Sequence, residues 1–128
     1  MTNKTPSLPF DDYPAFYETD NRQKRGFNPV SKAFLEAKFS TLLPPPSVQG
    51  KTVLDLGSCY GAAGQWVLFY GATHYTGVEV QANYVKQSRQ LLCHWQARAQ
   101  IVQQDVRHFL QQMADQSVDL VVLAGILY

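Results

Sequence analysis

The chain has 128 residues with a formal net charge of +1 at pH 7, and 45% of its residues are hydrophobic. This length suits one domain or part of one, and the near-neutral charge gives no electrostatic case for a nucleic-acid or membrane-surface partner. The two cysteines, Cys59 and Cys93, have no disulfide or metal-ligand spacing, and the first residues lack the apolar core of a signal peptide. No apolar run is long enough to span a bilayer. We therefore expect a cytoplasmic protein with no membrane segment and no metal site.

The first 49 residues divide into two parts. Residues 1–27 are polar with scattered aromatic side chains, and we interpret them as an arm or lid. Residues 28–49 predict a leading helix and a proline connector. Asn28 is a favourable cap, Pro29 suits the first helical position, and three prolines at 44–46 end the helix.

From residue 50 onward, short apolar segments alternate with segments of helical periodicity. Predicted strands occupy about 51–54, 75–79, 99–103 and 118–124, and predicted helices occupy about 63–70, 84–95 and 106–113. This alternation implies parallel βαβ units with right-handed crossovers. The fold class is therefore expected to be α/β with a parallel sheet.

A glycine-rich turn follows the first predicted strand, in the run Asp55-Leu56-Gly57-Ser58-Cys59-Tyr60-Gly61. The dinucleotide pattern fails because Cys59 stands two residues after Gly57, and no Gly-Lys-Ser/Thr of a Walker loop is present. A phosphate at a helix N-terminus favours positive potential, whereas Asp55 brings a carboxylate. Such an acid suits a ligand that carries an ammonium, a sulfonium or hydroxyl groups.

Two further acids stand at or just after strand ends. Glu79 closes the second predicted strand 24 residues after Asp55, a spacing typical of an acid that accepts ribose hydroxyls. Asp105 follows the third predicted strand. Because parallel strands deliver their carboxyl ends to one edge, these acids should meet where open α/β sheets bind ligands.

These features resemble the N-terminal, cofactor-binding part of a class I S-adenosylmethionine-dependent methyltransferase. Residues 53–61 match the family's first motif, Glu79 its ribose-binding acid, Asp105 its adenine-side acid, and residues 118–125 its fourth-strand motif. One departure is Cys59, which replaces the family's middle glycine. The resemblance implies a Rossmann-like doubly wound sheet with strand order 3-2-1-4, over residues 50–128, and S-adenosylmethionine as cofactor.

The resemblance also implies roles for individual residues. Asp55 would act on the cofactor's ammonium, partly through water, while Glu79 would accept the ribose hydroxyls and Asp105 the adenine amine. For Asp105 a helix-capping role is the alternative, because aspartate is favoured before a helix. The implied cofactor-binding set is Asp55, Gly57, Ser58, Cys59, Gly61, Glu79, Val80, Asp105, Val106, Ala124 and Gly125.

The methyl acceptor and the catalytic base are not identified by the sequence. Family members that methylate DNA base amines carry Asn/Asp-Pro-Pro-Tyr/Phe after the fourth strand, whereas this chain has Ala124-Gly125-Ile126-Leu127-Tyr128. We therefore expect no DNA amine substrate and prefer a small molecule, with protein and RNA open. The alternatives are a non-catalytic S-adenosylmethionine-binding module and a nucleotide-dependent oxidoreductase.

Only four strands can be found, whereas doubly wound sheets of this kind need about six or seven. We expect a domain truncated after strand four and inactive by itself. The fourth strand would then be an apolar sheet edge, which favours self-association.

Overall fold

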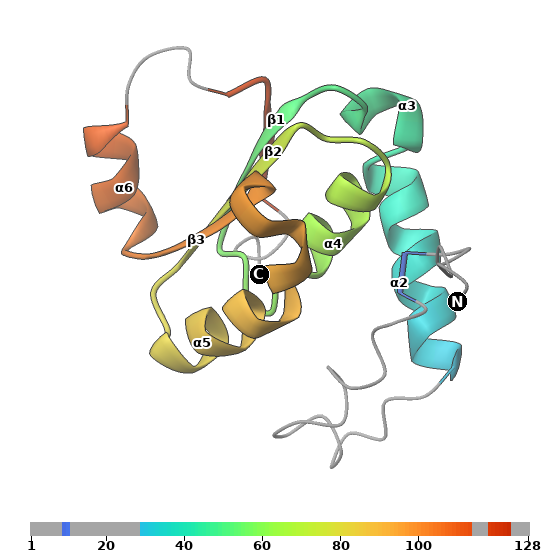
Figure 1. Ribbon diagram of the computed structural model, residues 1–128, viewed down its shortest axis with the longest axis horizontal. Helices are drawn as coiled ribbons and strands as arrows, with labels where there is room; N and C mark the ends of the chain where they lie inside the picture. The colour runs from blue at the N-terminus through green and yellow to red at the C-terminus, as the bar shows by residue number, and fades with distance from the viewer. Residues whose placement is uncertain (1–8, 11–28, 114–117, 124–128) are drawn as a thin grey trace.

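The computed structural model describes residues 9–10, 29–113 and 118–123 (Figure 1). Its four strands form one parallel sheet in the order β3-β2-β1-β4, which confirms the predicted order and the Rossmann-like α/β class. The strands are β1 (Thr52–Leu56), β2 (His74–Glu79), β3 (Ala99–Gln103) and β4 (Leu120–Val122).

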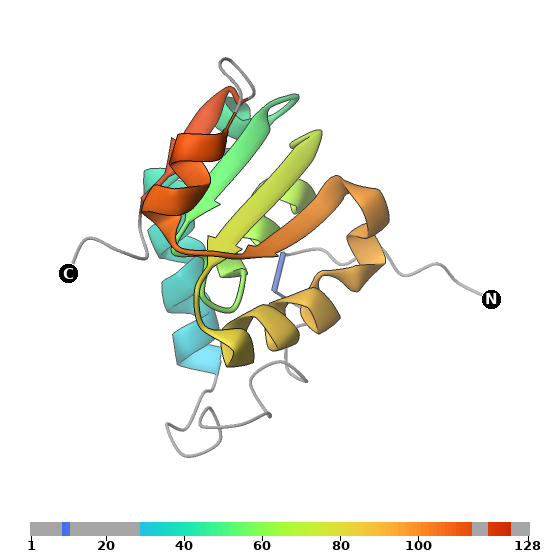
Figure 2. The same cartoon turned by 90° about the vertical axis from the view of Figure 1, so that its left-hand side faces the viewer.

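Helices connect these strands and cover both faces of the sheet. The helices are α2 (Pro29–Leu42), α3 (Pro45–Val48), α4 (Ala62–Phe69), α5 (Ala82–Leu91), the 3-10 helix η2 (Cys93–Arg98) and α6 (Val106–Gln112). Figure 2 shows α6 on one side of the sheet, and α4 and α5 on the other. Right-handed crossovers require helices on opposite faces, because the chain moves outward from β1 to β3 and then returns past β1 to β4. The reversal places the topological switch between β1 and β4.

Alternation along β1 and β2 divides the core into two layers. Leu54, Leu56 and Val78 are buried on the α6 side, while Val53 and Tyr75 are buried with α4 on the opposite side. Successive strand residues point to opposite faces. Asp55 and Glu79 are therefore on the same face as Val53 and Tyr75, toward the helices that follow β1 and β2.

The described part of the predicted arm is fixed to the helices. Phe10 is fully buried and lies 6.2 Å from the Phe39 ring and 6.3 Å from the Trp66 ring, between centroids. Gln65 Nε2 donates to the backbone oxygen of Pro9 at 2.6 Å. Residues 1–8 and 11–27 lie outside the described residues, so the role of 1–27 as an arm or lid stays a prediction.

Several boundaries differ from the sequence-based expectation. The proline connector contains the short helix α3, because proline is tolerated in the first turn of a helix. The helix predicted over 84–95 ends at Leu91 and continues as η2, with Gln96 at a φ of 56°. The fourth strand is confined to three residues. Just before it, Asp119 pairs with Thr52 through both its backbone N–H and its carboxylate.

None of the helices in the described ranges has both the length and the apolar character needed to cross a bilayer.

Candidate functional site

The turn between β1 and α4 contains three left-handed residues. Gly57, Cys59 and Gly61 have φ angles of 75°, 51° and 83°. Glycine adopts such angles without strain, whereas an L-residue such as Cys59 costs roughly 1–2 kcal/mol. A Cβ at Gly61 would also lie 2.9 Å from Leu92 Cδ1. The loop therefore keeps the conformation that its glycine pattern predicts, with the cysteine accommodated at the middle position.

The backbone N–H groups at the start of this loop point toward β2. Gly57 N and Ser58 N both donate to the carbonyl oxygen of Val78, at 2.8 and 3.1 Å. Cys59 N donates to Glu79 Oε1 at 2.9 Å. A phosphate-binding loop turns such groups toward its ligand. Three N–H groups here are already committed to the protein, so this part of the loop is not a phosphate cradle.

Glu79 is a buried acid, 6% exposed, at the carboxyl end of β2. Its Oε1 accepts from Cys59 N, and its Oε2 accepts from Gln81 N at 3.0 Å. A carboxylate offers about four acceptor positions, so these two bonds leave capacity for hydroxyl donors. Glu79 thus holds the glycine-rich loop against β2 and can also accept from a ligand.

Asp55 is 3% exposed and lies within β1, one residue before its end, opposite Gly77 of β2. Its Oδ2 accepts a 2.6 Å hydrogen bond from the Tyr75 hydroxyl. The pKa of the Asp55 carboxyl is raised to about 6, chiefly by burial. Of the smaller effects contained in this value, the Tyr75 hydrogen bond and Lys38 lower the pKa, and the charge of Glu79 raises it. The carboxyl therefore sits near its ionisation midpoint at mildly acidic pH.

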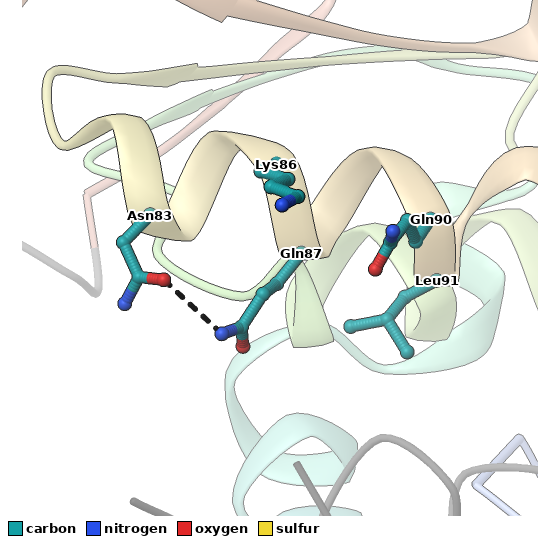
Figure 3. A pocket seen from close by; sticks show the side chains of 5 residues that line it. All are labelled: Asn83, Lys86, Gln87, Gln90 and Leu91. Carbon is teal, nitrogen blue, oxygen red and sulfur yellow. Dashed lines mark hydrogen bonds between the residues drawn. The ribbon is translucent and has the colours of Figure 1, made fainter. Parts of the chain in front are cut away.

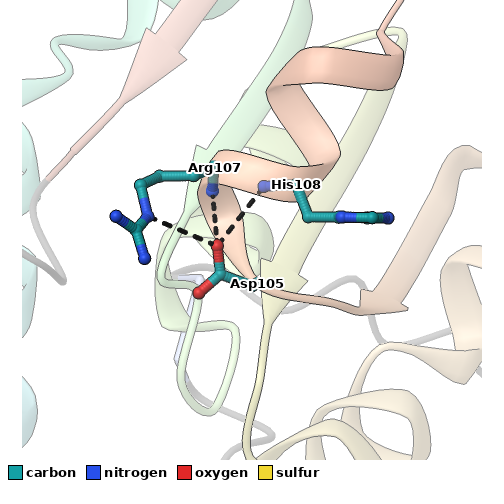
Figure 4. Close-up of polar contacts among 3 residues, drawn as sticks. All are labelled: Asp105, Arg107 and His108. Carbon is teal, nitrogen blue, oxygen red and sulfur yellow. Dashed lines mark hydrogen bonds and ion pairs between the residues drawn. The ribbon is translucent and has the colours of Figure 1, made fainter.

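Asp105 caps α6. Its Oδ1 accepts from Arg107 N at 2.9 Å and from His108 N at 3.3 Å, and the Arg107 Nε atom lies 3.8 Å away. Figure 4 shows the second carboxylate oxygen pointing away from both residues. The capping role is thus present, and it leaves one oxygen of a 56% exposed side chain for another partner.

The remaining predicted residues are placed as follows. Val80 is 59% exposed just beyond Glu79, and Val106 begins α6 and packs against the Leu54 layer. Ala124 and Gly125 lie outside the described residues. The three acids come from the carboxyl ends of three parallel strands, as predicted. Asp55 and Glu79 interact electrostatically, while Asp105 follows β3, beyond β2.

Two pockets lie away from these acids. One, of about 250 Å³, belongs to α5 and is shown in Figure 3, where Gln87 Nε2 donates to Asn83 Oδ1 at 3.2 Å. The other, also about 250 Å³, lies between α2 and α4 beside Pro9. Within the described ranges, no group of histidine, cysteine or acidic side chains could hold a metal ion.

A family model described as "Methyltransferase domain" matches residues 53–128. The chain belongs to this family. The match begins at β1 and includes the glycine-rich loop and all three acids of this methyltransferase domain. No curated protein matches the chain.

Solved structures share the fold of this methyltransferase domain. An S-adenosylmethionine-dependent methyltransferase from Mesorhizobium loti is 21% identical, with a TM-score of 0.53, and the match covers 66% of this chain and 36% of that one. A candidate RNA methyltransferase from Pyrococcus horikoshii is 22% identical, with a TM-score of 0.55 and coverages of 73% and 42%. The C-terminal domain of precorrin-6Y C5,15-methyltransferase from Rhodobacter capsulatus is 15% identical, with a TM-score of 0.54 and coverages of 64% and 44%. The chain spans less than half the length of these three structures.

Two residues of the methyltransferase domain were missed by sequence reasoning. Tyr75 was assigned only to an apolar strand, although its hydroxyl contacts Asp55. Asp55 and Tyr75 are 20 residues apart, so the register of β1 and β2 was needed to bring them together. Val78 was likewise a strand residue whose carbonyl holds the loop.

Proposed function

We propose that this methyltransferase domain binds S-adenosylmethionine at the carboxyl edge of its sheet and supplies the cofactor-binding half of a methyltransferase. The observation that supports this most is the pair of buried carboxylates at the glycine-rich loop. Asp55 and Glu79 are both at least nine-tenths buried, and the charge of Glu79 raises the pKa of Asp55. Burial of acids is costly unless charged or hydrogen-bonding groups meet them.

The acceptor groups suit the donors of this cofactor. Its ammonium, ribose hydroxyls and adenine amine are all hydrogen-bond donors, and the edge presents Asp55, Glu79 and Asp105 as acceptors. The buried Ser58 Oγ has no hydrogen-bond partner among the described residues. We assign Asp55 to the ammonium, partly through water, Glu79 to the two ribose hydroxyls, and the second oxygen of Asp105 to the adenine amine.

The loop residues have a supporting part in this assignment. Gly57, Ser58, Cys59 and Gly61 would lie along the methionine portion of the cofactor. Val80 and Val106, next to the ribose-binding and adenine-binding acids, complete the described part of the set. Ala124 and Gly125, which follow β4 in the sequence, complete the proposed set.

Bound S-adenosylmethionine supplies an electrophilic methyl group, so the protein's contribution is to hold donor and acceptor in line. We prefer a small-molecule acceptor and expect no DNA amine substrate, because the chain lacks the base-amine motif after β4. Protein and RNA acceptors are the alternatives, and the structural neighbours include both a candidate RNA methyltransferase and a precorrin methyltransferase.

A nucleotide-dependent oxidoreductase is disfavoured by the geometry of the loop. Dinucleotide binding uses N–H groups that face the pyrophosphate. Here Gly57, Ser58 and Cys59 donate to β2 instead. A non-catalytic module that only binds S-adenosylmethionine would use the same acids, and it is separated from an enzyme by assaying methyl transfer.

The experiment that tests the binding site is calorimetric titration of Glu79 variants with S-adenosylhomocysteine. Glu79→Ala removes two acceptor oxygens, which costs roughly 1–3 kcal/mol and weakens binding about tenfold to a hundredfold. Glu79→Gln keeps one carbonyl oxygen, so its affinity should lie between those of the wild type and Glu79→Ala. Glu36→Ala, a glutamate on α2, is the matched control. Unchanged affinity in a folded Glu79→Ala protein would contradict the assignment.

A further inference from the structure

The Tyr75 hydroxyl lies directly against the Asp55 carboxylate. Their oxygen atoms are 2.6 Å apart, Tyr75 is fully buried, and Asp55 is 3% exposed. Tyr75 packs on the α4 side of the sheet, and Asp55 is on the same side because it alternates with Val53 along β1. A short hydrogen bond to a buried carboxylate fixes where that carboxylate points.

Two glycines leave the space that Tyr75 fills. A Cβ at Gly64 of α4 would lie 2.6 Å from Tyr75 Cε2, and a Cβ at Gly77 would lie 2.9 Å from the Tyr75 hydroxyl oxygen. Gly77 is also the β2 residue paired with Asp55. The ring is therefore held between α4 and β2, and its hydroxyl reaches Asp55 only because both positions lack a side chain.

We propose that Tyr75 is a positioning residue for the cofactor: its buried hydroxyl orients the Asp55 carboxylate toward the cofactor's ammonium. This inference rests on the proposed function, because it requires Asp55 to receive that ammonium. It adds a residue near the start of β2, outside the glycine-rich loop and the three strand-end acids.

The charged and titratable groups around Asp55 make this role measurable. They are Tyr75 and Glu79 from β2 and Lys38 from α2. The ammonium pairs with the ionised carboxyl, so affinity should fall as pH decreases through the Asp55 pKa of about 6. The Tyr75 hydrogen bond lowers that pKa, so its removal should move the fall in affinity to higher pH.

The test is calorimetric titration of the 128-residue chain with S-adenosylhomocysteine from pH 5 to pH 8, in the wild type and in Tyr75→Phe. Phenylalanine keeps the ring between the two glycines and removes only the hydroxyl. We expect weaker binding at pH 7 and a higher pH midpoint in Tyr75→Phe. Tyr70→Phe, at the end of α4, is the matched control and should keep the wild-type midpoint.

The outcomes separate this role from the proposed function. A lower melting temperature with an unchanged pH midpoint would show that Tyr75 acts only in packing, and would overturn the proposal while leaving cofactor binding intact. Absence of binding by the wild type at every pH would overturn both. As a second measurement, ¹³C NMR of the Asp55 carboxyl in the free protein should show a higher pKa in Tyr75→Phe. An equal pKa would contradict the proposed hydrogen-bond role.

Discussion

Asp55→Asn should make the stability of the free protein less dependent on pH. The substitution keeps the shape of the side chain and leaves a carbonyl oxygen for the Tyr75 hydroxyl, but removes the charge. The folded-state pKa of Asp55 is raised from an ordinary value of 3.8 to about 6. A raised carboxyl pKa means that the folded state binds the proton more tightly than the unfolded state.

The sign and size of the effect follow from this difference. Between pH 3.8 and about pH 6, the wild type should lose stability as pH rises, because the buried carboxyl becomes charged. A difference of about two pKa units corresponds to about 3 kcal/mol of unfolding free energy above pH 6. Asp55→Asn lacks this loss, so its advantage over the wild type should grow with pH.

Urea unfolding of both proteins at intervals from pH 4 to pH 7.5 measures this difference directly. Other titrating groups are common to both proteins and should largely cancel in the difference between the two curves. Parallel curves across the whole range would refute the reasoning, because they would mean that Asp55 titrates alike in the folded and unfolded states. The same variant should bind S-adenosylhomocysteine more weakly than the wild type at pH 7.

Two further predictions concern Asp105 and the edge of the sheet. Affinity for S-adenosylhomocysteine should decrease in the order wild type, Asp105→Asn, Asp105→Ala, because asparagine keeps one acceptor oxygen. If Asp105→Ala binds as tightly as the wild type but melts at a lower temperature, Asp105 is only a helix cap, which contributes about 1 kcal/mol to stability. Val121 of β4 and Leu123, which follows the strand, are 46% and 40% exposed, so the 128-residue chain should self-associate in sedimentation through this edge. Val121→Lys should reduce this self-association. A wild-type monomer that melts cooperatively and transfers methyl groups would contradict the edge prediction.

Much of the fold could be predicted because its signals are local. The alternation of apolar and helical segments indicated a parallel α/β sheet, and the family resemblance indicated the order 3-2-1-4, which the structure has. Pro29 does begin a helix, and Asp105 does precede one. The acids were found because strand ends and glycine turns are marked by residue type.

The contacts between strands could not be predicted in the same way. The bond from Cys59 N to Glu79 and the bond from Tyr75 to Asp55 each join residues 20 positions apart. Both depend on the register of β1 with β2, which places Asp55 opposite Gly77. A shift of one residue would turn these side chains to the other face of the sheet. The sequence therefore located the acids but not the partners that fix them.

Titration of the wild-type chain with S-adenosylhomocysteine and, separately, with NAD tests the central claim most directly. The inward-facing N–H groups of the loop and the buried acids at the carboxyl edge predict saturable one-site binding of S-adenosylhomocysteine and no binding of NAD. Binding of NAD without binding of S-adenosylhomocysteine would contradict the account.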